Sequence, residues 1–341
     1  MWYQTVVDRK WLPDKILRLL IRYSLSQYSK RIRKLGYSEL DSYRKTFLDQ
    51  SLSGPIALDP NKANLQHYEL PTELFEVILG KYMKYSASIW DKNTRDIDSA
   101  EELTLKSYMV RAEIKNGQKI LDLGAGWGSF SIFLAENLLD SEITAITNSE
   151  TQKEFIELQC QEKNIDNLIV LKKDVNNLSL DMKFDRIISI EMLEHTRNVK
   201  KLMDLVSDWM TYESKFFIQV FAHRFYPQYF DDMENSWMAK HFFSGGMMPY
   251  PDLYKDLDSR LILTKSWFES GEHYHKTLES WLERLERYLR AGNLKQNKQL
   301  FPSQGRILLN RFRFFLLICS ELFSYNHGDD WILVNHLFHK Q

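Results

Sequence analysis

The sequence predicts an open α/β fold, in which a mostly parallel sheet of seven strands carries helices on both faces. Two observations predict it. From residue 118 onward, short apolar runs alternate with segments of helical spacing, and strands that alternate with helices in this way are joined by right-handed crossovers. A glycine-rich turn, LDLGAGWGS at 121–129, joins the first apolar run to the first helix of that series.

The expected elements follow the chain in order. Residues 14–36 place apolar side chains at helical spacing with Lys and Arg on the other face, and the turn-rich stretch 53–64 marks a junction. Strands are expected at 119–124, 142–148, 167–174, 184–190, 215–223, 261–270 and 329–338. The helices between them are expected at 129–139, 149–164, 199–210, 276–291 and 305–325.

Residues 224–258 interrupt the alternation of strands and helices. The stretch is aromatic, contains Gly and Pro, and is too long for an ordinary connection. Long insertions in compact domains are usually lids or binding loops, so an inserted cap is expected here.

Composition excludes several classes of function. The formal net charge of the 341 residues is −1 and there is no basic stripe, so no nucleic-acid partner is expected. No apolar run is long enough to span a membrane and no signal peptide precedes the first helix, so a cytoplasmic location is expected. His273 and His275 lack further ligands nearby in the sequence, so no metal is expected. The two cysteines, Cys160 and Cys319, are expected to be reduced thiols in helices.

Two features allow alternative interpretations. The basic N-terminal helix is either a docked surface helix or a point of peripheral membrane contact. Aromatic residues make up 13% of the chain, which means either a larger core or an aromatic cavity for an apolar or cationic ligand. A homodimer remains open.

The glycine-rich turn favours one class of cofactor. A dinucleotide-binding loop would have a third glycine where Ser129 stands, and an acidic residue where the second strand ends in Thr147 and Asn148. No phosphate-binding loop of the GxxxxGK[ST] type is present. The pattern GxGxG between a strand and a helix is typical of class I, Rossmann-like methyltransferases, which bind S-adenosylmethionine (SAM). A tight turn without a ligand is the structural alternative.

Three titratable side chains follow the expected fourth strand. EMLEHTRN at 191–198 contains Glu191, Glu194 and His195. Charged groups at the end of an apolar strand are costly unless they are solvated, paired or used. The carboxyl end of a parallel sheet is also where open α/β folds bind ligands. A helix N-terminal carboxylate for Glu191 and a surface pair for Glu194 and His195 are the alternatives.

Longer motifs carry a resemblance to a known family. QHYELP, KYMKYSASIW, LDLGAGWGSFSIFLAE, TNSETQ, FDRIISIEMLEHTRN, FFSGGMMP and HYHKTLESWLER occur in this order. Together they resemble the cyclopropane-fatty-acid synthase-like methyltransferases. With the ending SYNHGDDWILVNHLFHK, the chain looks most like the small-molecule branch typified by plant coclaurine N-methyltransferase.

The resemblance implies the domain plan and the cofactor site. Residues 1–117 would form a helical cap and SAM-entry segment, and 118–341 the SAM-binding core with the cap insertion 224–258. Asp122 lies beside the glycine turn. The positions matching those that contact SAM in the family are Tyr85, Ser86, Gly124, Gly126, Trp127, Thr147, Asn148, Gln152, Asp174, Val175 and Ile190.

The resemblance also implies acceptor-side residues. Glu194 and His195 match an acid/base dyad of the N-methyltransferase branch, supported by Glu191. In the lipid-cyclopropanating branch a bicarbonate ion is held at positions that correspond here to Ala87, Glu194, His223 and Tyr274. Ala87 replaces the cysteine of that set. His223 as a core histidine and Tyr274 as a packed tyrosine are the structural alternatives.

The expected reaction is therefore methyl transfer from SAM to the nitrogen of a small amine, leaving S-adenosylhomocysteine. The alternative acceptor is a lipid: methylene or methyl transfer to an unsaturated acyl chain. A third alternative is a SAM-binding protein without catalysis.

Overall fold

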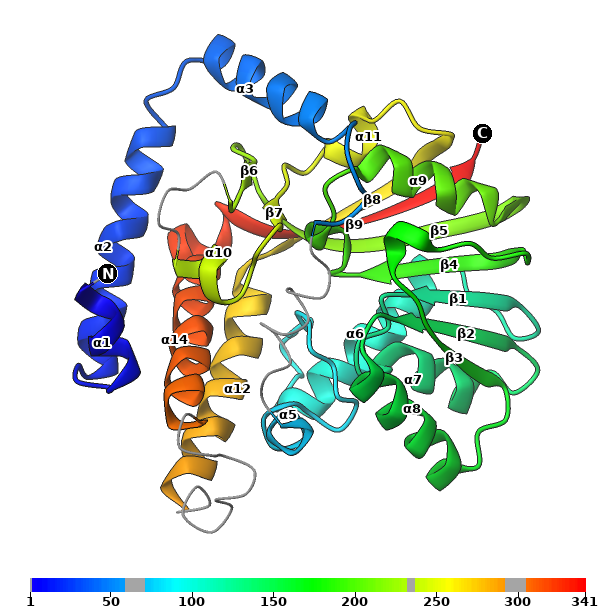
Figure 1. The fold of residues 1–341 in the computed structure, drawn as a ribbon, viewed down its shortest axis with the longest axis horizontal. Coiled ribbons are helices and arrows are strands. Elements are labelled where there is room, and N and C mark those ends of the chain that lie inside the picture. Colours follow the sequence, from blue (N-terminus) through cyan, green and yellow to red (C-terminus); the bar gives the residue numbers. More distant parts are fainter. Residues whose placement is uncertain (1, 59–70, 232–236, 292–304) are drawn as a thin grey trace.

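The computed structural model describes residues 2–58, 71–231, 237–291 and 305–341 (Figure 1). The motif QHYELP, apart from its last residue, lies outside these ranges. One seven-stranded sheet forms the centre, in the order β3-β2-β1-β4-β5-β9-β8. Its strands are β1 (Lys119–Leu123), β2 (Glu142–Thr147), β3 (Leu168–Lys172), β4 (Phe184–Ile190), β5 (Met210–His223), β8 (Leu261–Ser270) and β9 (Trp331–Lys340).

The sheet is parallel from β3 to β5, and β9 is antiparallel to both of its neighbours, β5 and β8. This confirms the predicted seven-stranded, mostly parallel sheet. β5 begins earlier than expected, because Met210 pairs with Phe184 before the register shifts and Lys215 pairs with Arg186. The central strands are buried on both faces, which explains their continuous apolar runs.

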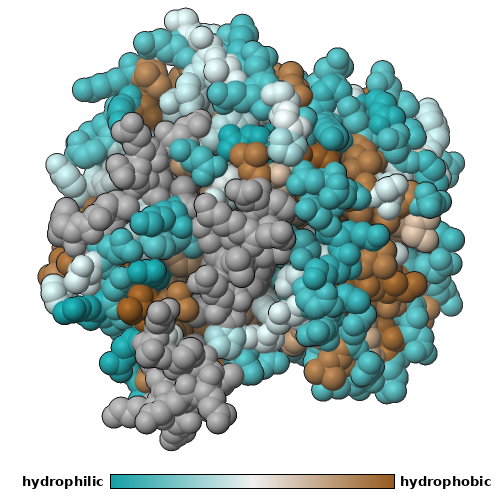
Figure 2. All heavy atoms as spheres, viewed as in Figure 1, coloured by the Kyte–Doolittle hydropathy of each residue, from teal (hydrophilic) through white to brown (hydrophobic). Residues whose placement is uncertain are grey.

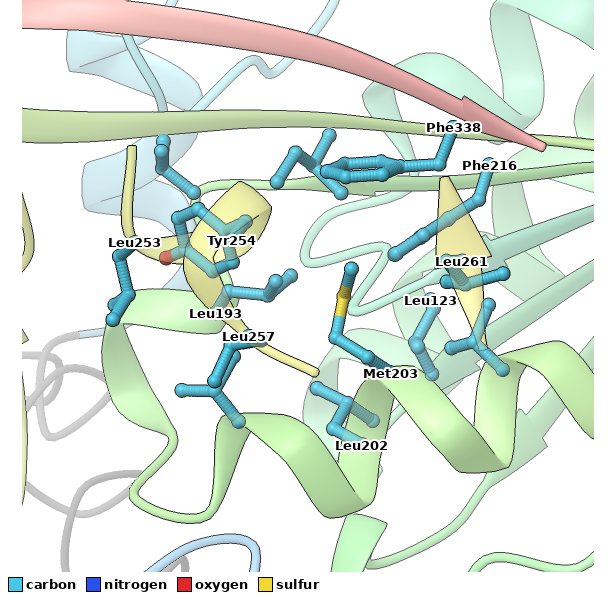
Figure 3. Close-up of a cluster of buried hydrophobic side chains, with 14 of the residues drawn as sticks. Leu123, Leu193, Leu202, Met203, Phe216, Leu253, Tyr254, Leu257, Leu261 and Phe338 are labelled. Carbon is cyan, nitrogen blue, oxygen red and sulfur yellow. The ribbon is translucent and has the colours of Figure 1, made fainter. Parts of the chain in front are cut away.

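Helices cover both faces of the sheet, as predicted. α6 (Ile97–Arg111), α7 (Ser129–Asn137) and α8 (Glu150–Lys163) share a core with one face, which includes Phe217. α9 (Val199–Asp208) packs on the other face, where Phe216 points, since successive side chains of a strand alternate. Figure 3 shows Leu202 and Met203 of α9 facing Phe216 and Phe338 of the sheet.

A second group of helices stands beside the sheet (Figure 1). α12 (Glu272–Arg290) and α14 (Gly305–Ser324) pack together, and α14 carries α1 (Trp2–Asp8) and α2 (Asp14–Ile32) on its outer side (Figure 1). α3 (Tyr37–Gln50) and α5 (Thr72–Ile78) complete the N-terminal part. The insertion 224–258 contains α10 (Trp237–His241), α11 (Leu253–Asp256) and a small antiparallel pair, β6 (Gln228–Tyr229) and β7 (Met247–Met248).

On the face seen in Figure 2, hydrophilic side chains cover most of the surface, with apolar ones in small groups. No helix in the described part of the chain has the length and hydropathy needed to cross a bilayer.

Candidate active site

The glycine turn after β1 lies at the carboxyl end of the sheet and leaves space for a ligand. Gly124, Gly126 and Gly128 all have positive φ, at +86°, +56° and +77°. A Cβ on Gly124 would meet the Met192 side chain at 2.6 Å, whereas a Cβ on Gly126 would meet nothing within 4 Å. Gly126 therefore borders open space, and a ligand can approach its backbone closely.

A cavity of about 160 Å³ opens beside this turn, between the ends of β1 and β2 and the segment after β4. Thr147 donates a hydrogen bond of 2.6 Å to Oε1 of Gln152. Nε2 of Gln152 is buried and has no hydrogen-bond partner in the described part of the chain. A buried donor without a partner is costly, so this wall suits a ligand that carries hydroxyl groups. Described residues lining the cavity include Ala57, Leu58, Gly124, Gly126, Thr147, Asn148, Gln152, Lys173, Val175, Met192 and His195.

A smaller cavity of about 100 Å³ lies on the other side of the same turn. Among the described residues that line it, Lys84 is the only cation, and Asp122 and Glu191 are the acids. The Lys84 ammonium is buried, donates to Ser86 Oγ at 2.7 Å and to the Ala87 carbonyl, and has its pKa lowered to about 8 by burial. Buried charges of both signs in one cavity suit a zwitterion such as an amino-acid group. Tyr85, Ser86, Trp127, Ser129 and Ile190 also line it.

Asp122 is a buried residue that lines this smaller cavity. Its carboxylate accepts a hydrogen bond of 2.6 Å from Ser131 Oγ. Burial raises the pKa of Asp122 to about 6, so at neutral pH the group is still largely ionised. The acid is thus available to an ammonium group of a ligand.

Glu191 lies where the cavities meet. Its Oε1 accepts hydrogen bonds of 2.9 Å from the Ala87 backbone N–H and from Gln219 Nε2, and the Tyr274 hydroxyl also donates to the carboxylate. Its φ of +49° is unusual for a residue with a side chain. Strained backbone of this kind persists where surrounding contacts fix it, and it clusters at functional sites. Burial raises the pKa of Glu191, while the nearby Lys84 ammonium lowers it.

A third cavity, of about 280 Å³, opens on the other side of Glu191. Half of the described residues that line it are aromatic. Its polar side chains in the described part of the chain include Ser24, Glu191, His195 and Gln228, together with tyrosine hydroxyls and the Cys319 thiol. The aromatic residues lining it are Tyr28, Tyr85, Phe221, Phe230, Phe243, Tyr274, Trp281, Phe315, Phe323 and Trp331. They come from α2, β5, α12, α14, β9, the insertion and the segment before α6. We call this space the acceptor cavity.

His195 lines both the acceptor cavity and the cavity at the end of β2. Its ring stacks on Phe243, with centroids 4.7 Å apart and planes inclined by 17°. Burial lowers the pKa of His195 to about 4, so the imidazole is neutral at pH 7. This pKa lies well below the range in which a histidine usually acts as a base at neutral pH.

Three expected site residues are not brought to a cavity wall. Glu194 is buried behind its neighbours, where its Oε1 accepts a 2.7 Å hydrogen bond from the Phe221 backbone N–H. Nδ1 of His223 accepts the backbone N–H groups of residues 225 and 226, and so caps the turn after β5. The Asp174 carboxylate accepts the N–H of residue 176 and caps a short 3-10 turn. None of these three side chains lines the cavities beside them, and their direct contact with cofactor or acceptor stays a prediction.

The four positions that hold bicarbonate in the lipid-cyclopropanating branch are likewise not assembled around one space. Of its four positions only Tyr274 lines the acceptor cavity. The Ala87 N–H and the Tyr274 hydroxyl both donate to Glu191, a carboxylate of the chain itself. Burial and the neighbouring Glu191 charge raise the pKa of Glu194 well above the usual range, which disfavours a second anion there.

Sequence reasoning missed two polar residues of the site. Lys84 directly precedes the YSAS motif, and this position in the sequence is the feature that could have pointed to it. Gln219 lies inside the apolar run of β5, where a buried amide needs a partner, and it finds that partner in Glu191. The aromatic wall was indicated only by the composition and by the aromatic insertion 224–258, which supplies Phe230 and Phe243.

Known proteins match this chain over most of its length. Residues 58–332 match the model of the mycolic acid cyclopropane synthetase family. An (S)-coclaurine N-methyltransferase from Papaver somniferum is 31% identical over 345 residues, covering 97% of this chain and 95% of the relative. A cyclopropane-fatty-acyl-phospholipid synthase from Escherichia coli is 27% identical over 271 residues, covering 79% of this chain and 66% of the relative.

A solved structure of a coclaurine N-methyltransferase, bound to N-methylheliamine and SAH, matches with a TM-score of 0.93 and 26% identity, covering 99% of this chain and 98% of that chain. The two cavities beside the glycine turn have what SAM requires: an unpartnered buried amide donor, backbone that a ligand can approach, and buried charges of both signs. The chain therefore belongs to the mycolic acid cyclopropane synthetase family and is a SAM-dependent methyltransferase.

Proposed function

We propose that this enzyme methylates the nitrogen of a small amine with an aromatic or otherwise apolar body. The observation that carries the proposal is the acceptor cavity, in which aromatic rings surround a space that ends at the buried Glu191 carboxylate. Aromatic faces and a carboxylate both attract an ammonium group, and an apolar wall suits an apolar body. The N-methyltransferase activity named for the Papaver relative supports the same reaction class.

The proposed role of Glu191 is to accept the proton of the bound ammonium group. When bound, SAM supplies an electrophilic methyl group on a sulfonium, and only a nitrogen with a free lone pair can attack it. Intrinsic pKa values favour histidine as the base near neutral pH. Burial reverses this order here, because it lowers the pKa of His195 to about 4 and raises the pKa of Glu191. An ionised Glu191 is therefore the stronger base, and neutral His195 is suited to accept a hydrogen bond from the amine.

Glu194 is proposed as a positioning residue in this arrangement. Its hydrogen bond to the Phe221 N–H ties the turn that carries His195 to β5. Glu194 and His195 would then act together, as expected from the sequence, but Glu194 would do so by fixing the position of the imidazole.

The proposed domain plan has a cap at 1–117 and a second cap at 224–258, over a core of 118–341. It is supported by the wall of the acceptor cavity, because α2 and the insertion 224–258 both contribute residues to that wall.

The test is a methylation assay across a panel of acceptors, read by the mass gain of one methyl group. The panel contains aromatic secondary amines, aliphatic amines of similar size, and vesicles of unsaturated phospholipid. Aromatic amines are expected to be methylated with the highest kcat/KM. Modification of the acyl chains without any amine product would overturn the proposal in favour of the lipid reaction.

A further inference from the structure

The outward face of α2 carries four large apolar side chains. Ile16, Leu19, Leu20 and Tyr23 are 42%, 64%, 53% and 67% exposed. Their spacing of three, four and seven residues places them on one side of the helix. We call these four residues the outer stripe. A contiguous exposed apolar stripe of this kind marks an interaction surface more often than a single exposed residue does.

The exposure of the outer stripe follows from how α2 is fixed. The opposite face packs inward through buried Leu17 and partly buried Leu25 and Tyr28. Polar contacts hold the same orientation: Arg18 pairs with the buried Glu321 of α14 at 2.7 Å, and Ser29 Oγ donates to Asp330 at 3.1 Å. Turning the helix to bury the outer stripe would break all of these contacts.

Cations continue the outer stripe toward the C-terminal end of α2 and just beyond it. Lys30, Arg31 and Lys34 are exposed there, and the structure gives none of them an ion pair among the described residues. The single acid of α2, Asp14, is paired with Arg313. The face is therefore apolar and cationic, with no carboxylate of the helix left for a second copy of the same helix to pair with.

We propose that the outer stripe and its flanking cations dock this enzyme onto an anionic lipid surface. An interfacial helix inserts apolar side chains at the level of the headgroups and attracts anionic lipids with Lys and Arg. The same helix lines the acceptor cavity with Ser24, Leu25 and Tyr28. Docking would therefore hold the cavity wall next to a phase in which apolar acceptors concentrate.

The experiment is sedimentation of the full chain with vesicles of phosphatidylcholine, alone or mixed with phosphatidylglycerol. Binding is expected to the anionic vesicles, and it should weaken as salt is added. Leu19→Gln with Tyr23→Gln should raise the lipid concentration needed for half-binding by about tenfold or more. Lys30→Gln with Lys34→Gln should remove the preference for anionic lipid. Leu139→Gln, a substitution at a 77% exposed leucine after α7, is the matched control and should bind as wild type.

Two readouts distinguish lipid docking from damage to the active site and from self-association. Methylation of a soluble amine without vesicles should be unchanged in all of these variants, because none of the substituted residues lines any of the three cavities. Equal binding to neutral and anionic vesicles, or no binding at low salt, would overturn the proposal. So would light scattering that shows a dimer which Leu19→Gln with Tyr23→Gln dissociates, because the partner would then be a second copy.

Discussion

The cofactor side and the acceptor side of the active site are built in opposite ways. The cofactor side takes most of its residues from a few short stretches: 83–86, 122–130, 146–152 and 190–192. The acceptor cavity takes its wall from α2, β5, α12, α14, β9 and the insertion. The first offers polar groups and open backbone, and the second offers aromatic rings. Cofactor recognition is thus encoded locally in the sequence, whereas acceptor recognition depends on tertiary packing.

Glu191 is the residue on which both sides depend, so its removal should have the largest effect. Glu191→Gln keeps the shape but not the charge, and we expect kcat to fall by about 10²–10⁴-fold. Glu194→Gln is the matched control, because its amide oxygen can still accept the Phe221 N–H; it should lose far less activity. Steady-state kinetics at saturating SAM measure both. Equal losses in the two variants would contradict the separate roles.

The pH profile tests the same assignment. Glu191 must be ionised to take a proton, and its folded pKa is raised, so activity should be present above that pKa and lost as pH falls through it. The acid limb of kcat should therefore lie above the usual range of a glutamate. His195→Gln should lower kcat but keep this limb, because burial lowers the pKa of His195 to about 4. Loss of the limb in His195→Gln, with its retention in Glu191→Gln, would make His195 the base.

Substitutions at two glycines distinguish an effect on cofactor affinity from an effect on the stability of the fold. Gly126→Ala should weaken SAM binding at least tenfold, because its Cβ would enter space that borders the cavity, and should cost about 1–2 kcal/mol for its positive φ. Gly124→Ala adds a clash with Met192 to a similar strain, so it should lower the melting temperature more. Calorimetry of binding and of unfolding distinguishes them. Equal thermal stability of the two variants would show that the turn relaxes freely.

The acceptor side can be changed alone at Cys319. Cys319→Leu adds volume at the wall of the acceptor cavity and should raise KM for an aromatic amine roughly tenfold, with SAM affinity unchanged. Cys319→Ala, which removes the thiol without adding volume, is the control and should keep KM near wild type. Weaker SAM binding in Cys319→Leu would mean that the two sides are coupled by packing.

The smallest effect is expected on the cofactor side at Lys84. Its ammonium favours the ionised form of Glu191, so Lys84→Met should raise the pKa of Glu191 further and move the acid limb of kcat up by about one pH unit. SAM should also bind more weakly. Lys173→Met, at an exposed lysine lining the cavity by β2, is the control and should leave the limb in place. If the acid limb does not move in Lys84→Met, the Lys84 ammonium does not affect the pKa of Glu191.

The sequence was sufficient to predict those features that a single short stretch of the chain forms by itself. The strands and the glycine turn lie where they were predicted. Eleven of the twelve expected cofactor residues, all but Asp174, line the cavities beside that turn, and their contact with SAM stays a prediction. Asp174 stays off the cavity wall because an aspartate two residues before a backbone N–H can cap it, and that local bond satisfies the carboxylate. His223 stays off the wall for the same reason, since its Nδ1 accepts two backbone N–H groups of the next turn.

The acceptor side could be predicted only in part. Glu191, His195 and Tyr274 line the acceptor cavity, but the direction in which Glu194 points depends on β5, which follows it by more than fifteen residues. The pKa of His195 depends on burial by Phe243 and other distant segments. No periodicity or motif contains that information, because it arises only when the segments pack.

The strand order has a consequence for how the chain assembles. β8 precedes β9 along the chain, yet it joins the sheet only through β9, which lies between it and β5. The strands from β3 to β5 can pair as soon as β5 exists, so the half that holds SAM can form first. The acceptor cavity includes Trp331 of β9 and is completed only when this late strand inserts between its neighbours. The last strand of the chain therefore completes the part of the enzyme that selects the acceptor.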